Sequence, residues 1–193
     1  MHPLQKRIIL CLAEKGPQTI NETKENISSH YKSTWMAFNS LEKKGLIHKT
    51  RDKNYRGREY PQFWLTFEGI ILSALEEASI NSLLKHAKDC LPPENADTDR
   101  VLATIESAKH MDRRLLQHTY SILRRKEKLE PMDVVLLTIQ AGMIQGITFD
   151  EGIEQIKAIA TVFEKYPRLN EELKAARDDM DKVMQEIKKF VKP

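Results

Sequence analysis

The sequence is poor in residues that break regular structure or form covalent cross-links. Its 193 residues include only 7 glycines, 8 prolines and 2 cysteines. Cys11 and Cys90 are too few for a disulfide framework, so we expect both to be free thiols. No apolar run reaches the roughly 18 residues that a membrane span needs, and the first residues lack the apolar core of a secretory signal. We therefore expect an ordered, helix-rich chain that is soluble and cytoplasmic, with no membrane partner.

Recognisable catalytic motifs are also lacking. The chain has no glycine-rich phosphate loop, no Gly-x-Ser-x-Gly nucleophile elbow and no His-Glu-x-x-His zinc pair. His86 and Cys90 are four residues apart and could supply two metal ligands, but no second pair completes a site. We expect no catalytic residue, no metal, no cofactor and no enzyme activity. The C-terminal half could hold a small-molecule effector between its helices, although no residue pattern identifies one.

Charge is unevenly distributed along the chain. The net charge is +3, but residues 1–88 carry 14 Lys and Arg against 9 Asp and Glu, whereas the remainder carries 17 against 19. Between Lys43 and Arg58 there are seven cations and one acid, Asp52. A local positive field of this kind is typical of a surface that meets phosphate.

Prolines mark a boundary near the middle of the chain. The segment DCLPPENAD at residues 89–97 interrupts helical patterns on both sides. We predict a first domain at residues 1–88, a linker at 89–98 and a helical second domain at 99–193. The expected fold class is mainly α with a small β-hairpin.

Three helices are predicted at the start of the first domain. Apolar residues recur at helical spacing from Leu4, and Gly16-Pro17 ends this first helix. Thr19-Ile20-Asn21-Glu22 is a capping box that starts a second helix through about Asn26. Ser28-Ser29 offers an N-cap for a third helix that Gly45 ends. The apolar stripe of the third helix is Tyr31, Trp35, Phe38 and Leu41.

A β-hairpin and a further helix are predicted next. Residues 46–51 and 60–66 are rich in β-branched and aromatic residues and flank a polar, glycine-containing loop. Pro61 cannot donate a ladder hydrogen bond, so its strand should be an edge strand or join the sheet after Pro61. Thr66 is a plausible N-cap for the following helix. The apolar positions of that helix run to the proline break and are Ile70, Ile71, Leu75, Ile80, Leu83 and Leu84.

The order helix, helix, helix, hairpin, helix is that of a winged helix-turn-helix domain. The segments ILCLAEKGPQTINETKENI, STWMAFNSLEKKGLI and GREYPQFWLTFEGI resemble the winged-helix transcriptional regulators of bacteria and archaea, broadly the PadR and MarR groups. The most specific part is LEKKGLI at residues 41–47, followed by LTFEG at 65–69. The resemblance covers residues 4–75. It departs from PadR-like members at Ile20-Asn21, where these have a Gly-Tyr pair.

The resemblance implies a sequence-specific regulator that binds double-stranded DNA. Its third helix would enter the major groove, and its wing would lie along the backbone or the minor groove. In the third helix, Ser33 and Asn39 suit base edges, whereas lysines suit phosphates. The expected DNA contacts are Lys32, Ser33, Met36, Asn39, Ser40 and Lys43 in the helix, and Lys49, Arg51, Lys53, Arg56 and Arg58 in the wing.

Other functions for the same fold stay open. A charged hairpin is often only solvated, and winged helices also serve as protein–protein interaction modules in larger assemblies without binding DNA; RNA is a further alternative. Trp35 and Phe38 are expected in the core. Tyr55 at the wing tip is either simply exposed or in contact with sugar or base, and Trp64 is not assigned.

The second domain is expected to be helical and to pair subunits. Helices are predicted from about Asp99 to Lys128 and from Pro131 to about Gly146, and residues 148–151 form another capping box. The last helix carries an apolar seam with alternating steps of four and three, namely Leu169, Leu173, Ala176, Met180, Val183, Ile187 and Phe190. We expect a homodimer through this coiled-coil seam, through the helix after the wing, or through both; the alternative is a helix packed in its own subunit. A twofold dimer would present two recognition helices to half-sites about one DNA turn apart.

Overall fold

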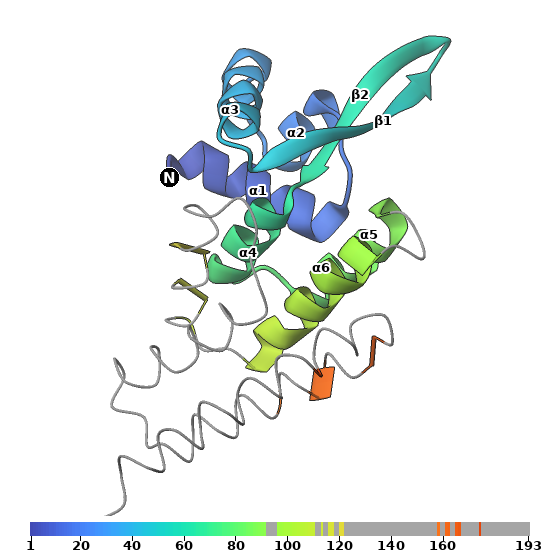
Figure 1. Ribbon diagram of the computed structural model, residues 1–193. Helices are drawn as coiled ribbons and strands as arrows, with labels where there is room; N and C mark the ends of the chain where they lie inside the picture. Colours follow the sequence, from blue (N-terminus) through green and yellow to red (C-terminus); the bar gives the residue numbers. More distant parts are fainter. Residues whose placement is uncertain are drawn as a thin grey trace, which may run out of the picture. The chain divides into compact units, whose positions relative to one another are not determined.

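The computed structural model describes residues 1–91 and 96–110, together with Arg113, Leu116, Gln117, Tyr120, Ser121, Ala158, Thr161, Val162, Lys165, Tyr166 and Lys174. The chain divides into two compact units, Met1–Pro93 and Glu94–Pro193. Within the described ranges, the protein is mainly helical with one antiparallel two-stranded hairpin (Figure 1). None of the helices described there is both long and apolar enough to cross a bilayer.

The first two helices begin and end as local sequence signals predict. Helix α1 (Pro3–Lys15) ends at Gly16, which has a φ of 80°. Helix α2 (Ile20–Asn26) starts with the predicted capping box. There the Thr19 side chain accepts from the backbone N–H of Glu22 at 3.2 Å, and the Glu22 carboxylate accepts from the Thr19 N–H at 2.8 Å. This reciprocal bonding satisfies backbone donors that a short helix cannot satisfy internally.

Helix α3 (Tyr31–Lys43) starts differently from the prediction. Its N-cap is His30, without a side-chain cap hydrogen bond, rather than Ser28 or Ser29. The backbone of Ser28 has a φ of 48°, in the turn before the helix, while the Ser29 and Thr34 hydroxyls bond each other at 2.5 Å. The serine side chain is therefore used against a threonine inside the helix instead of a free backbone donor.

Strands β1 (Ile47–Tyr55) and β2 (Arg58–Leu65) form a hairpin longer than the predicted strands. The central turn residues Arg56 and Gly57 both have positive φ, at 53° and 76°, as a two-residue hairpin turn of the primed kind requires. The Asn54 side chain accepts from the Gly57 N–H at 3.1 Å and holds this turn. In the described sheet both strands are edge strands, as Pro61 requires.

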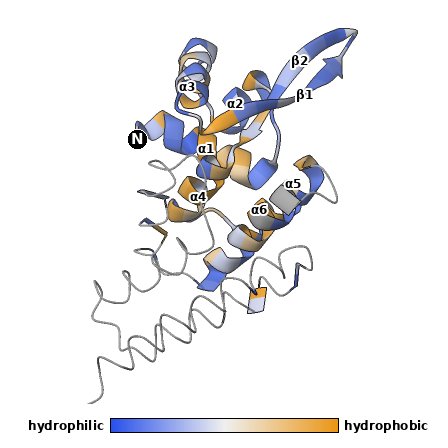
Figure 2. Cartoon of the chain, viewed as in Figure 1, coloured by the Kyte–Doolittle hydropathy of each residue, from blue (hydrophilic) through white to orange (hydrophobic). Residues whose placement is uncertain are grey.

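The core of the first unit forms around α1, which contacts α2, α3, β2 and the two helices that follow the hairpin. Its largest fully buried side chain is Trp64, whose ring Nε1 donates to the carbonyl of Leu12 at 3.1 Å. Apolar residues gather on α1, on the helix after the hairpin and at the base of the hairpin, while the outer half of the hairpin is hydrophilic (Figure 2). The hairpin is thus anchored at its base.

One long helix was predicted after the hairpin, but the structure has two, α4 (Phe67–Leu75) and α5 (Ile80–Cys90). Thr66 caps α4, as predicted. The break follows because Glu77 adopts a φ of 69° and Ser79 starts a new helix, its side chain accepting from the N–H of Ser82. Apolar periodicity continues across the break, so it could not reveal a turn made by polar residues.

Gly69 in α4 fits a close approach to the start of the hairpin. A Cβ at this position would lie 2.0 Å from the carbonyl oxygen of Leu46. The N–H of Thr66 donates to the same carbonyl at 3.1 Å. The first turn of α4 is therefore fastened directly beside β1, and only glycine permits this distance.

In the second unit, α6 (Ala96–Ser107) is followed by a 3₁₀ turn at Ala108–His110. The helix predicted from about Asp99 to Lys128 begins three residues earlier than expected and is interrupted by this turn, and its predicted end lies outside the described residues. Glu106 accepts hydrogen bonds from Lys165 Nζ at 2.5 Å and from Tyr166 Oη at 3.1 Å. The predicted helix at 131–146, the capping box at 148–151 and the seam from Leu169 to Phe190 lie outside the described residues.

Candidate nucleic-acid interface

Helix α3 has one buried side and one open side. Its buried residues are Thr34, Ala37, Phe38 and Leu41. The opposite side carries a line of residues at steps of four, three and four, a spacing that keeps side chains on one side of a helix. We call this line the α3 stripe, and it comprises Lys32, Met36, Asn39 and Lys43. The two lysines and Met36 are exposed, and Asn39 is half-buried.

The polar ends of the α3 stripe are not used inside the protein. Within the residues that the structure describes, no hydrogen bond or ion pair engages the side chain of Lys32, Asn39 or Lys43. Ser33 lies beside the stripe and is exposed. Ser40, on the same flank, is half-buried, and its hydroxyl accepts from Gln5 Nε2 at 2.9 Å. Ser40 therefore has a structural contact, whereas the stripe keeps its polar groups available.

On the other flank of α3, the structure differs from the predicted core. Trp35 was expected to be buried, but 47% of it is exposed, and Tyr31 is 52% exposed. Phe38 is buried as predicted, with 1% exposed. The true buried line passes through Thr34 and Ala37, so it is rotated away from Tyr31 and Trp35. A hydroxyl residue and a small residue, Thr34 and Ala37, share the buried face with Phe38 and Leu41. A search for large apolar residues could not find these two.

The two faces of the hairpin point in different directions. The ring of Phe63 in β2 packs edge-on against Phe38 of α3, with centroids 5.3 Å apart, so this face of the hairpin is turned toward α3. Lys49 lies directly opposite Phe63. Side chains of directly opposite residues share a face, so Lys49 belongs to the α3 side. Lys49 forms an ion pair with Asp52 at 3.0 Å, which offsets its charge.

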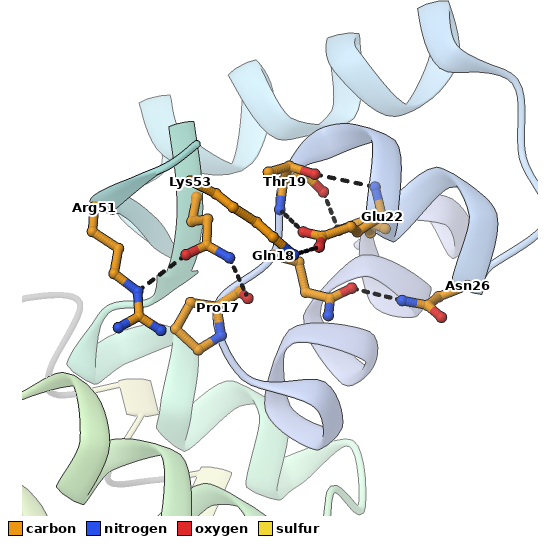
Figure 3. Close-up of polar contacts among 9 residues, drawn as sticks. Pro17, Gln18, Thr19, Glu22, Asn26, Arg51 and Lys53 are labelled. Atoms are coloured by element: carbon orange, nitrogen blue, oxygen red, sulfur yellow. Dashed lines mark hydrogen bonds and ion pairs between the residues drawn. The ribbon is translucent and has the colours of Figure 1, made fainter. Parts of the chain in front are cut away.

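Arg51 and Lys53 are turned to the opposite face, where α2 lies (Figure 3). A bulge between Lys49 and Arg51 shifts the register, and Arg51 lies opposite Gln62, the neighbour of Phe63. Arg51 Nε donates to Gln62 Oε1 at 3.0 Å, and Gln62 Nε2 donates to the carbonyl of Pro17 at 3.3 Å. Arg51 is thus part of a hydrogen-bonded chain that ties the hairpin to the segment before α2.

Lys53 forms an ion pair with Glu22 of α2 (Figure 3). Burial by itself would raise the pKa of Glu22, but the hydrogen bonds from Lys53 and from the backbone and side chain of Thr19 outweigh it and lower that pKa. Glu22 therefore serves as both cap and ion-pair partner. The capping box predicts the first role, but no local pattern joins residues 22 and 53.

The tip of the hairpin is the exposed cationic part. The Arg56 guanidinium lies 5.2 Å from the centroid of the Tyr55 ring, and Tyr55 is 58% exposed. Arg58 is also exposed and lies opposite Tyr55 across the turn. Among the residues described, neither arginine forms an ion pair with a carboxylate. Stacking on Tyr55 leaves the edge of the Arg56 guanidinium able to donate to phosphate.

The predicted contact residues therefore separate into two groups. The side chains of the first group have no hydrogen bond or ion pair in the described part of the chain, and we call them the unengaged set: Lys32, Ser33, Met36, Asn39, Lys43, Arg56 and Arg58. The second group has partners in its own chain and consists of Ser40, Lys49, Arg51 and Lys53. Ser40, Arg51 and Lys53 have partners in other elements, and Lys49 pairs with Asp52 of its own strand, so composition alone could not separate the groups.

His86, one of the two residues considered for metal binding, contacts other residues of its own unit. His86 Nε2 lies 3.1 Å from the carbonyl oxygen of Glu14, and its ring packs against Gly16. Burial raises the pKa of the Cys90 thiol, against the opposing effect of the nearby Arg51 charge. Cys11 and Cys90 are free thiols. In the described part of the chain, no group of three or more His, Cys, Asp and Glu side chains is arranged to hold a metal.

Comparison with protein-family models, with curated proteins and with solved structures finds no match to this chain. The fold class rests on the described elements, mainly helices with one two-stranded hairpin. The likeness to winged-helix regulators therefore stays a prediction from the sequence motifs.

Proposed function

We propose that residues 1–91 form a winged helix-turn-helix unit that binds double-stranded DNA. The element order supports this proposal, since three helices precede the hairpin and α4 follows it. A further support is the antiparallel bridge between Gln18 and Phe63, with hydrogen bonds of 3.1 Å and 2.9 Å, which attaches the segment between α1 and α2 to β2. Helices α2 and α3 are then the helix-turn-helix, and β1–β2 is the wing.

The observation that carries the proposal is the α3 stripe. A line with an exposed lysine at each end and a half-buried amide between them, none of these polar groups engaged within the described chain, fits a helix that lies in a groove between two phosphate backbones. Lys32 and Lys43 would contact phosphates on either side. Asn39 would read a base edge, for which a carboxamide suits adenine best.

The hairpin would contribute its tip rather than its whole length. Among the wing cations, Arg56 and Arg58 are the two with neither a side-chain hydrogen bond nor an ion pair in the described chain, and guanidinium groups suit both phosphate and a narrow minor groove. Arg51 and Lys53 would stabilise the position of the wing through Gln62 and Glu22. The engaged residues are thus supports, and the unengaged set makes the contacts.

The complete regulator is proposed to be a homodimer. The seam from Leu169 to Phe190 lies outside the described residues, so the proposal of pairing rests on its heptad spacing. A twofold dimer would place two copies of α3 at half-sites about one DNA turn apart. An effector that changes the pairing would then change DNA affinity.

A titration of the full chain against random-sequence duplex at several salt concentrations tests the proposal. The expected result is micromolar or tighter binding that weakens steeply with salt, because each phosphate contact releases condensed counterions. Absence of binding even at low salt would refute DNA binding. A salt-independent affinity would also contradict it, because lysines and arginines supply the proposed contacts.

A second candidate function has one specific observation in its favour. Tyr31 and Trp35 form an exposed aromatic edge on α3, and aromatic residues are enriched in protein interfaces. A protein–protein module would use this edge and would not need the cations of the hairpin tip. The salt titration separates the two candidates, because only DNA binding gives the steep slope.

A further inference from the structure

Met36 is an unusual residue for the middle of a polar line. It is 57% exposed and has Lys32 one turn before it and Asn39 one turn after it, all on the open side of α3. Single exposed apolar residues are common and need no explanation by themselves. Here the flanking residues matter, because Lys32 suits a phosphate and Asn39 suits a base edge. If both bind DNA, the Met36 thioether must also lie against DNA.

The major groove offers one apolar group to such a side chain. Every base edge there presents hydrogen-bond donors or acceptors, and the 5-methyl group of thymine is the exception. A thioether pressed against a polar base edge would remove water without replacing its hydrogen bonds. Against a methyl group, the same contact removes apolar surface from water and is favourable. A flexible, unbranched methionine can adapt to that contact.

The spacing of the α3 stripe relates Met36 to Asn39. Three residues advance a helix by about 4.5 Å, which is close to the separation of about 3.4 Å between neighbouring base pairs. Asn39 and Met36 would therefore meet neighbouring base pairs. A carboxamide selects adenine, whose partner is thymine, so both positions favour an A·T pair.

We propose that Met36 is a specificity-determining residue that reads the 5-methyl group of thymine beside an adenine read by Asn39. The inference rests on the proposed DNA binding and narrows its target to sites in which two neighbouring A·T pairs face α3. Charge complementarity supports a nucleic acid at this position, since Lys32 and Lys43 bracket Met36. The exposed acid of α3, Glu42, lies on the flank with Trp35 rather than in the stripe.

Modified duplexes test this proposal without knowledge of the natural site. The probes are alternating A·T duplexes of about 20 base pairs, two helical turns, containing either thymine or deoxyuridine. The two probes have the same phosphates and the same Watson–Crick edges, and they differ in the methyl groups. The chain should bind the thymine duplex about fourfold more tightly for each methyl group contacted, which is the usual value of one buried methyl.

Two variants at the same position make the test specific. Met36→Gln keeps the length of the side chain and should remove the preference for thymine over deoxyuridine, while Met36→Leu should retain it. Asn39→Ala should keep this methyl preference and reduce the preference for A·T over G·C duplexes. Because Met36 is exposed, thermal unfolding of its variants should match that of the parent chain.

The outcomes separate this inference from the proposed function. Equal affinity for thymine and deoxyuridine duplexes, with normal salt dependence, would overturn the role of Met36 and leave DNA binding intact. A preference that persists in Met36→Gln would also overturn it, because another side chain would then read the methyl group. No binding to any duplex at low salt would overturn both proposals.

Discussion

The base and the tip of the hairpin β1–β2 carry different kinds of residue and contact. At the base, Trp64 is 0%, Leu65 1% and Ile47 2% exposed, and the Trp64 ring is bonded to a helix carbonyl. At the tip, Tyr55 is more than half exposed and Arg56 and Arg58 have no acidic partner in the described chain. Between them, Arg51 and Lys53 are paired with other elements of the unit. Moving outward along one hairpin, the side chains change from buried, to paired with other elements, to exposed and without an acidic partner in the described chain.

This gradient shows that like charges close together in sequence can have unlike roles. The sequence offers five cations from Lys49 to Arg58 as one cluster. In the structure, the bulge after Lys49 leaves this residue on one face of the hairpin and places Arg51 and Lys53 on the other. The number of cations in the sequence therefore overestimates the number that lack a partner in the described chain, and the following predictions test the gradient directly.

The largest effect is expected at the base. Trp64→Ala removes a fully buried ring and a buried hydrogen bond, and should lower the free energy of unfolding by about 3–5 kcal/mol. Urea unfolding followed by circular dichroism measures this change. Tyr55→Ala at the tip is the matched aromatic control and should change stability by less than about 0.5 kcal/mol. Similar losses in both variants would remove the distinction between base and tip.

At the tip, binding should change while stability does not. Arg56→Ala combined with Arg58→Ala should weaken binding to random duplex by about tenfold at low salt and reduce the log–log salt slope by about two. Fluorescence anisotropy measures both values. Lys85→Ala with Lys88→Ala removes two exposed cations from α5 and is the charge-matched control. An equal change in the control would mean that net charge, rather than the hairpin tip, governs binding.

The middle of the hairpin is held by Glu22 through Lys53, and Glu22 is also part of the capping box of α2. Thr19→Ala removes the oxygen that accepts from the Glu22 N–H, and should cost about 1 kcal/mol of stability. Thr19→Ser keeps the hydroxyl and should recover most of this loss. Thermal unfolding of the three proteins checks the effect. Equal losses in the alanine and serine variants would show that the threonine methyl group, not the cap, is responsible.

A smaller, pH-dependent effect is expected from Glu22 itself. Its pKa is lowered in the folded state from an ordinary value of 4.5, so its contribution to stability is present above that value and is lost as the pH falls through the lower, folded pKa. Glu22→Gln should therefore destabilise the protein by less than about 1 kcal/mol at neutral pH, since the carboxylate is partly exposed. The difference from the parent chain should shrink in acid.

Thermal melts from neutral pH down to about pH 3 follow this difference. Glu25→Gln removes an exposed acid of the same helix and is the charge-matched control. If the difference in stability between the parent chain and Glu22→Gln stays constant across this pH range, the proposed role of the lowered Glu22 pKa is contradicted.

Local signals in the sequence predict several features of this fold correctly. Gly16 ends α1, the Thr19–Glu22 box starts α2, and Thr66 caps α4, because each signal acts within three or four residues. The position of the hairpin is also predicted. Its length is not, since the polar outer half carries no apolar alternation to mark it as strand.

Features that depend on contacts between distant residues escaped prediction. The exposure of Trp35 follows from the orientation of α3, which its small buried residues decide. The break before α5 is a local turn that also escaped prediction, because Glu77 is a non-glycine residue in a positive-φ conformation. The engagement of Lys53 requires Glu22, more than thirty residues away. For the candidate site, the sequence predicted helix α3 and the hairpin, but it could not separate side chains with partners in the described chain from those without them.

Oxidative labelling of side chains, with and without random-sequence duplex at low salt, tests the central claim most directly. The rate of oxidation is measured at the methionine, tryptophan and tyrosine side chains of the full chain. The account predicts that Met36 and Tyr55 are labelled several-fold more slowly when DNA is bound, whereas Tyr166 in the second unit keeps its rate. Unchanged labelling of Met36 and Tyr55 on chains that carry bound DNA would contradict the claim that α3 and the hairpin tip form the contact.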